Sequence, residues 1–140
     1  MDIKELDNAL LAIAEKKNTI SELDYNDELY DQVEQELHDL EDDFIENFGD
    51  YMEDTLTDIH DEHCPESDVL LPTAYLAKKY VDRGSSPSGQ KLLDVDSDEG
   101  VIVDTDDYPN KVVRLVIVPG PTRILLQIGK ETREEVWTAG

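Results

Sequence analysis

The chain has 140 residues, which suits one domain, and its 39% of apolar residues place it above the disordered class. The formal net charge is −23. Such a charge argues against direct binding of nucleic acid or of anionic membranes, because both are polyanions.

Two helices are predicted first, as a hairpin. Apolar residues recur at helical spacing over residues 2–17, and Asn18-Thr19 is expected to end this helix in a turn. A second helix is expected to begin between residues 21 and 26 and to continue to about residue 62. Gly49-Asp50 leaves two alternatives open: an unbroken helix, or a break or kink with Gly49 after one segment and Asp50 as the next N-cap.

The apolar stripe of the second helix predicts a further partner surface. Unbroken, this helix would be about 55 Å long, whereas the first covers only about 24 Å of it. The part of the stripe near Leu56 and Ile59 must therefore pack on the C-terminal sheet or on a second copy of the protein. Because the spacing is also close to a heptad, we expect a homodimer.

The rest of the chain predicts mainly strands. Residues 72–80 are expected to form a short helix, and residues 83–89 a flexible connector. Strands follow near 91–96, 100–105, 111–118, 123–129 and 134–138, joined by short turns, which favours an antiparallel β-meander. The prediction is one α+β domain, residues 1–140: an acidic helical hairpin (1–66), a short helix and linker (67–90), and a meander of four or five strands (91–140).

The register of the sheet follows from the turn between its two most apolar strands. If residues 119–122 form a four-residue loop, Val118 faces Arg123. One face then carries Val113, Leu115, Ile117, Ile124, Leu126 and Ile128, and we expect the helices to pack on it. The other face carries Arg114, Val116, Val118, Arg123, Leu125 and Gln127, and is expected to be exposed, either as a contact surface or as scattered apolar residues.

The negative charge is concentrated in the helical half. Residues 1–68 contain 24 acidic and 3 basic residues, and the stretch from Asn18 to Asp68 has 20 acidic residues and no Lys or Arg. Like charges four residues apart on a helix are unfavourable by about 0.2–0.5 kcal/mol per pair. The surface either keeps the protein soluble or presents a carboxylate array to a basic protein partner, and such an array could imitate a nucleic-acid backbone.

The binding alternative predicts a non-enzymatic protein-interaction module. Its candidate partner-binding residues are Asp31, Glu34, Asp39, Asp42, Asp43, Glu46, Asp54 and Asp58. No cofactor is expected for this function.

A metal-binding protein is the alternative, with two candidate sites for a divalent metal. His60, His63 and Cys64 lie on adjacent faces of the second helix and are residue types that bind transition metals. Asp94, Asp96 and Asp98 resemble the start of a calcium loop, but glycine stands at position seven instead of six, so the EF-hand pattern is not met. If residues 91–106 form a hairpin, Asp94 opposes Asp104 and these carboxylates form a cluster for a cation.

Enzymatic function has weaker support in the sequence. Phosphate-binding loops, dinucleotide motifs and nucleophile elbows are absent. An enzyme that uses clustered carboxylates remains the second alternative.

Cysteine content and apolar run lengths bear on the compartment. Cys64 is the only cysteine, so an internal disulfide cannot form. The first residues lack the pattern of a signal peptide, and the apolar runs are too short to span a bilayer. A cytoplasmic protein without membrane contact is expected.

Overall fold

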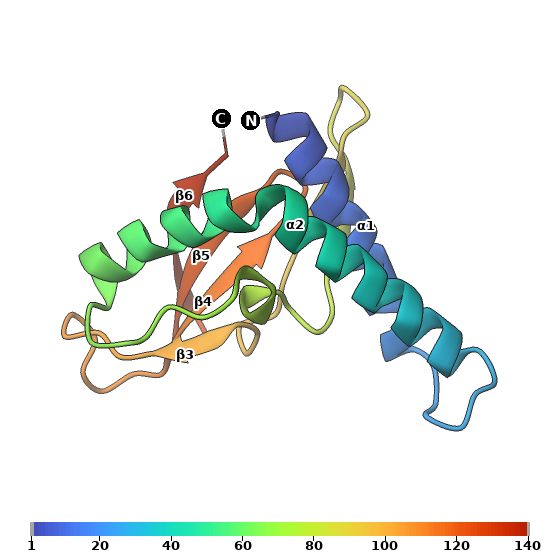
Figure 1. Cartoon of the computed structure of the whole chain (residues 1–140). Helices are drawn as coiled ribbons and strands as arrows, with labels where there is room; N and C mark the ends of the chain where they lie inside the picture. Colours follow the sequence, from blue (N-terminus) through green and yellow to red (C-terminus); the bar gives the residue numbers. More distant parts are fainter. Residues whose placement is uncertain (1, 140) are drawn as a thin grey trace.

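The computed structural model describes residues 2–139 as a helical hairpin followed by antiparallel strands (Figure 1). The helices are α1 (Ile3–Ser21), α2 (Tyr30–His63) and the single 3₁₀ turn η1 (Pro72–Tyr75). Strands β3 to β6 form a four-stranded sheet in chain order, and β1 and β2 form a separate pair. The predicted α+β fold is confirmed. The strands are β1 (Val81–Ser85), β2 (Lys91–Asp94), β3 (Val101–Val103), β4 (Val113–Val118), β5 (Arg123–Ile128) and β6 (Thr132–Thr138).

Helix α1 continues past the predicted turn. It begins as expected at Asp2, whose side chain accepts hydrogen bonds from the backbone of Lys4 and Glu5. The turn predicted at Asn18 is wrong, because the Asn18 side chain binds a different segment instead of its own backbone. Its amide donates to the carbonyl of Tyr80 (3.0 Å) and accepts from the amide of Tyr80 (2.7 Å). This residue therefore ties α1 to the segment that precedes β1.

Helix α2 is continuous through Gly49 and begins at Tyr30, later than predicted. Of the two alternatives left open at Gly49-Asp50, the break is excluded: Gly49 is a buried residue inside the helix, and it does not adopt the positive φ of a helix-ending glycine. Figure 1 shows α2 bending near its middle, where its colour passes from teal to green. The bend lets one arm of α2 follow α1 while the other crosses the sheet.

The predicted register of β4 and β5 is confirmed. Val118 faces Arg123, and the pairing continues to Val113 opposite Ile128. The face with Leu115, Ile117, Ile124 and Leu126 belongs to one buried cluster together with Leu6 and Leu10 of α1 and Leu56 and Ile59 of α2. The excess apolar stripe of α2 is thus covered by the sheet of the same chain.

The opposite face of the sheet is also buried, so its predicted exposure is wrong. Val116, Val118 and Leu125 pack against Tyr80 and Leu93 in a second cluster. The polar residues of this face bind the backbone of the covering segment. Arg123 donates to the carbonyl of Leu93 (2.7 Å), and Gln127 donates to the carbonyls of Asp96 (2.9 Å) and Glu99 (3.0 Å).

The covering segment was predicted incorrectly in three places. The helix expected over residues 72–80 is a single 3₁₀ turn, after which Leu76 forms a parallel bridge with Ile117. The connector expected at residues 83–89 contributes to β1 and to its turn. Strand β2 pairs with β1 and not with β3. The β1–β2 hairpin has a register irregularity that includes Gly84 and a turn that includes Gly89, and both glycines have positive φ.

Candidate functional site

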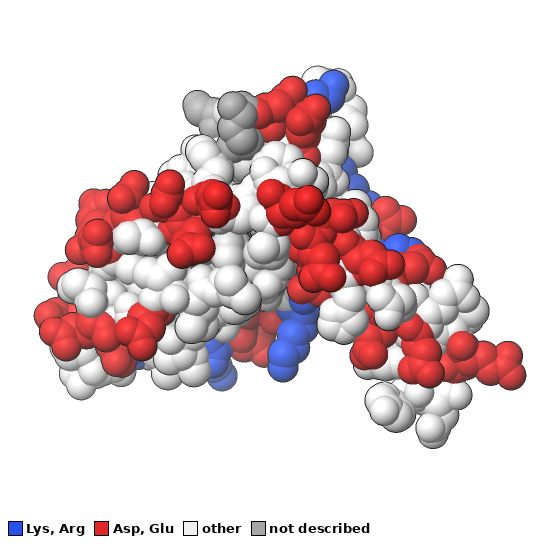
Figure 2. Space-filling view, viewed as in Figure 1, with Lys and Arg blue, Asp and Glu red and all other residues white. Residues whose placement is uncertain are grey.

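The outer face of α2 carries the acidic residues that were predicted to bind a partner. All eight are exposed, while residues such as Val33, Phe44 and Leu56 point into the core from the same helix. Figure 2 shows acidic side chains along both arms of α2, with basic side chains confined to other parts of this view. We call these eight residues the acidic stripe: Asp31, Glu34, Asp39, Asp42, Asp43, Glu46, Asp54 and Asp58.

Two further residues, Asp50 and Glu53, extend this surface. Both are exposed, and they follow Glu46 at spacings of four and seven residues, which places them on the same side of the helix. If α2 had broken at Gly49, Asp50 would have been the N-cap of the next segment, with Glu53 three residues later. Because α2 does not break at Gly49, neither caps a helix end, and both add their charge to the outer face.

Few cations of the chain neutralise α2. Among residues 2–139, Lys16 is the one Lys or Arg that forms an ion pair with this helix, and its partner is Glu36, outside the acidic stripe. Hydrogen bonds from Lys16 and from Gln32 lower the pKa of Glu36. The acidic stripe itself therefore faces solvent without an ion pair to Lys or Arg in this part of the chain.

The residues of the first candidate metal site are used in a different way. His60 is buried, and both of its ring nitrogens have partners: Nδ1 lies 3.0 Å from the carbonyl of Ser67, and Nε2 lies 2.8 Å from the hydroxyl of Tyr75. Since a carbonyl can only accept, Nδ1 carries the proton and Nε2 accepts from the tyrosine. Burial raises the pKa of the Cys64 thiol to about 11, which leaves it a poor metal ligand and nucleophile at neutral pH.

The residues of the second candidate metal site do not face one another. Because β2 pairs with β1, Asp94 lies opposite Val81 instead of Asp104, and the predicted 91–106 hairpin is wrong. Asp94 instead pairs with Arg133 of β6 and, at 3.6 Å, with Arg83 of β1. Asp96 and Asp104 are exposed.

The structure does not bring the predicted ligands of either metal site together. Within residues 2–139, no three His, Cys, Asp or Glu side chains come together in a way that could hold a metal ion. In the same part of the chain, no helix is both long and apolar enough to cross a membrane.

Comparisons with known proteins give this chain no relative. No family model matches it, and neither a curated protein nor a solved structure shows significant similarity. The function must therefore be inferred from the chemistry of the surface itself.

The Asp94 carboxylate connects the small sheet to the large one and makes stability depend on pH. Burial raises its pKa, but the hydrogen bond and charge of Arg133 and the bond from the Val95 amide outweigh this, so the net pKa lies below the ordinary value of 3.8. A lowered folded-state pKa means that the stabilisation is present above the unfolded pKa and is lost as the pH falls through the folded one.

We expect Asp94→Asn to lower the free energy of unfolding by about 1 kcal/mol near pH 7. The difference from the parent protein should shrink as the pH falls below about 4, measured by urea unfolding across the range. Asp96→Asn, a neighbouring exposed carboxylate without an ion pair in residues 2–139, is the matched control and should change stability by less than about 0.5 kcal/mol. A pH-independent difference would contradict the ion-pair explanation.

Proposed function

We propose that the protein is a non-enzymatic interaction module that presents the acidic stripe to a basic protein partner. The observation that carries the proposal is the exposure of all eight carboxylates on the outer side of one helix, in a stretch without Lys or Arg. Pairs such as Asp39 and Asp43 repel each other, at about 0.2–0.5 kcal/mol per pair. A basic partner would relieve this repulsion on binding.

The length of α2 supports a protein partner over a small cation. A helix of 34 residues is about 51 Å long, which exceeds the diameter of a small protein domain, about 30 Å. Complementary charge over such a length accelerates association and makes binding strongly dependent on salt. Enhanced solubility without a partner is the competing explanation, and the experiment separates the two.

The test compares two variants with the same net charge. One neutralises the middle of the acidic stripe, with Asp39→Asn, Asp42→Asn, Asp43→Asn and Glu46→Gln. The control neutralises four exposed acidic residues outside the helices, with Asp104→Asn, Asp106→Asn, Asp107→Asn and Glu131→Gln. The probe is a lysine-rich peptide, and its affinity is measured by calorimetry at about 50 mM and 300 mM salt.

We expect the parent protein and the control to bind the peptide with similar affinity at low salt, and the stripe variant to bind about tenfold more weakly. For the parent protein, binding should weaken steeply at high salt. Equal weakening in both variants would show that only the total charge matters, which is the behaviour of a solubilising surface. Such a result would contradict the proposal.

The oligomeric state belongs to the same proposal. The homodimer was predicted because the apolar stripe near Leu56 and Ile59 required a cover, and the sheet of the same chain now supplies one. That argument no longer supports a dimer, and we propose that one chain is the binding unit. A single buried cysteine, Cys64, supports the cytoplasmic location expected from the sequence.

A further inference from the structure

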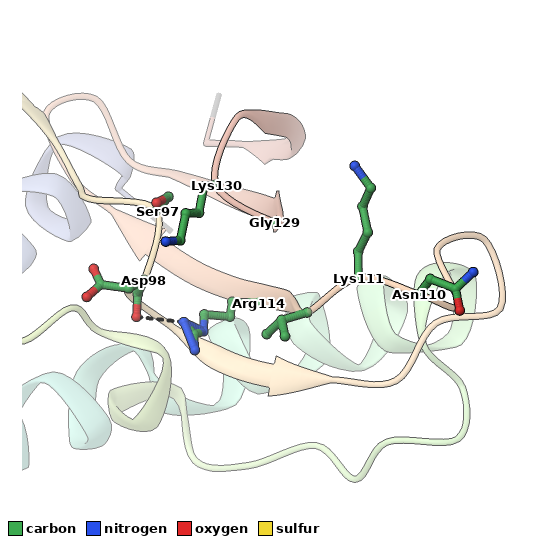
Figure 3. A pocket seen from close by; sticks show the side chains of 8 residues that line it. Ser97, Asp98, Asn110, Lys111, Arg114, Gly129 and Lys130 are labelled. Atoms are coloured by element: carbon green, nitrogen blue, oxygen red, sulfur yellow. Dashed lines mark hydrogen bonds between the residues drawn. The ribbon is translucent and has the colours of Figure 1, made fainter.

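A pocket on the face of the sheet turned away from α2 gathers three of the twelve basic residues of the chain. Its volume is about 420 Å³, within the range of small-molecule sites. Arg114 lies in β4, Lys111 in the loop before β4, and Lys130 in the β5–β6 turn (Figure 3). Ser97 and Asp98 lie in the β2–β3 loop. Segments distant in the sequence thus build one site.

The charge of this pocket is opposite to that of the whole protein. Asp98 is the one acidic residue that lines it, so the three cations give a local charge of about +2 in a chain of net charge −23. Among residues 2–139, none of the three forms an ion pair with an Asp or Glu side chain. Neighbouring cations without a counter-ion favour the binding of an anion.

Arg114 gives the pocket a specific donor. Its Nη1 donates to the carbonyl of Asp98 (2.9 Å), and this bond fixes the guanidinium over the sheet. The Nε atom is buried without a hydrogen-bond partner, which is unfavourable for a donor. Arginine commonly binds carboxylates and phosphates through two parallel hydrogen bonds, so its guanidinium suits an oxyanion in this pocket.

The remaining residues define which kind of anion fits. Figure 3 shows Lys130 pointing toward the Ser97–Asp98 loop, whereas Lys111 extends outward at the rim. Val112, an apolar residue that is 54% exposed, also lines the pocket. A ligand with one charged group and an apolar body would use both kinds of surface.

We propose that this pocket binds a small organic anion, whose phosphate or carboxylate contacts Arg114 and Lys130 and whose apolar part rests on Val112. The site is independent of the acidic stripe and of its proposed partner. At physiological ionic strength the Debye length is about 8 Å, so the cations of the pocket act on a bound anion more strongly than the distant carboxylates of α2.

The experiment follows backbone amide signals by NMR during titration with phenyl phosphate, with benzoate and with uncharged benzyl alcohol. We expect saturable shifts at residues 97–98, 110–112 and 129–130 with an anionic probe. The variant Lys111→Gln/Lys130→Gln should lower the affinity about tenfold. Its control, Lys4→Gln/Lys79→Gln, has the same net charge and changes exposed lysines outside the pocket, so it should bind as the parent protein does.

Each outcome decides the proposal. Tighter binding of phenyl phosphate assigns the site to phosphate esters, and tighter binding of benzoate assigns it to carboxylates; both support an organic-anion site. Equal affinity for benzyl alcohol, equal weakening in the two double variants, or shifts scattered over the protein would overturn it. The absence of saturable binding by either anion would do the same.

Discussion

Replacing Leu56 by alanine is expected to lower the free energy of unfolding by about 3 kcal/mol. Leu56 lies in the second arm of α2, has no exposed surface, and belongs to the same buried cluster as Leu115 and Leu126 of the sheet. The substitution removes apolar contacts between the helix and the sheet. It also leaves a cavity there, because a close-packed core relaxes only partially around a smaller side chain. Urea unfolding followed by circular dichroism gives the difference directly.

Urea unfolding also tests whether α2 packs on the sheet of its own chain or on a second copy of the protein. If the sheet of one chain covers Leu56, the unfolding midpoint of the parent protein and of Leu56→Ala stays constant over about a hundredfold range of protein concentration. A midpoint that rises with concentration would instead show that a second copy contributes. Asn47→Ala, an exposed position on the same helix, is the control and should change stability by less than about 0.5 kcal/mol.

The spacing of apolar residues predicted the parts of the fold in which apolar side chains simply pack into the core. The helical spacing of Leu6, Leu10 and Phe44 predicted both helices, and all three residues are buried. The loop length between β4 and β5 predicted the pairing of Val118 with Arg123. Both signals are local, since they depend on residues close together in the chain.

The errors arose where a distant segment changed the role of a residue. Arg123 and Gln127 suggested a solvent-exposed face, but their side chains bind the backbone of residues 93–99 and help to bury that face. Asn18 suggested a turn, but it binds the backbone of Tyr80. A polar residue in a sequence does not reveal whether its partner is water or a remote peptide group.

The two candidate sites differ in the same respect. The acidic stripe could be predicted, because its residues lie on one helix and share a spacing. The pocket around Arg114 could not, since its three cations are distributed over residues 111–130 and meet Asp98 only after the sheet has formed. In the sequence they are three basic residues among many acidic ones, without a motif.

His60 links the fold to the question of metal binding. The amide of Leu70 donates to the hydroxyl of Tyr75 (2.9 Å), which donates to Nε2 of His60, and Nδ1 of His60 donates to the carbonyl of Ser67. This chain of hydrogen bonds ties the end of α2 to the segment that leads to η1. A metal could bind His60 only by displacing one of these partners, so the bonds serve the structure in the absence of a metal.

A double-mutant cycle measures how much these hydrogen bonds contribute to the stability of the protein. Tyr75→Phe leaves Nε2 of His60 and the Leu70 amide without a partner, and we expect it to lower the free energy of unfolding by about 2 kcal/mol. His60→Leu keeps a similar volume but leaves the O–H of Tyr75 without an acceptor and the Ser67 carbonyl without a donor, with an expected loss of about 2–3 kcal/mol. The double variant should lose about 1–2 kcal/mol less than the sum, because the bond between the two side chains is lost only once.

The control replaces a histidine that takes no part in these hydrogen bonds. His38 is exposed on the other arm of α2, so Tyr75→Phe combined with His38→Leu should be additive within about 0.5 kcal/mol. Additivity for the His60 pair as well would show that the hydrogen bond between Tyr75 and His60 does not stabilise the protein. A coupling confined to the His60 pair would instead show that Nε2 of His60 stabilises the fold through Tyr75, so its lone pair is not free for a metal.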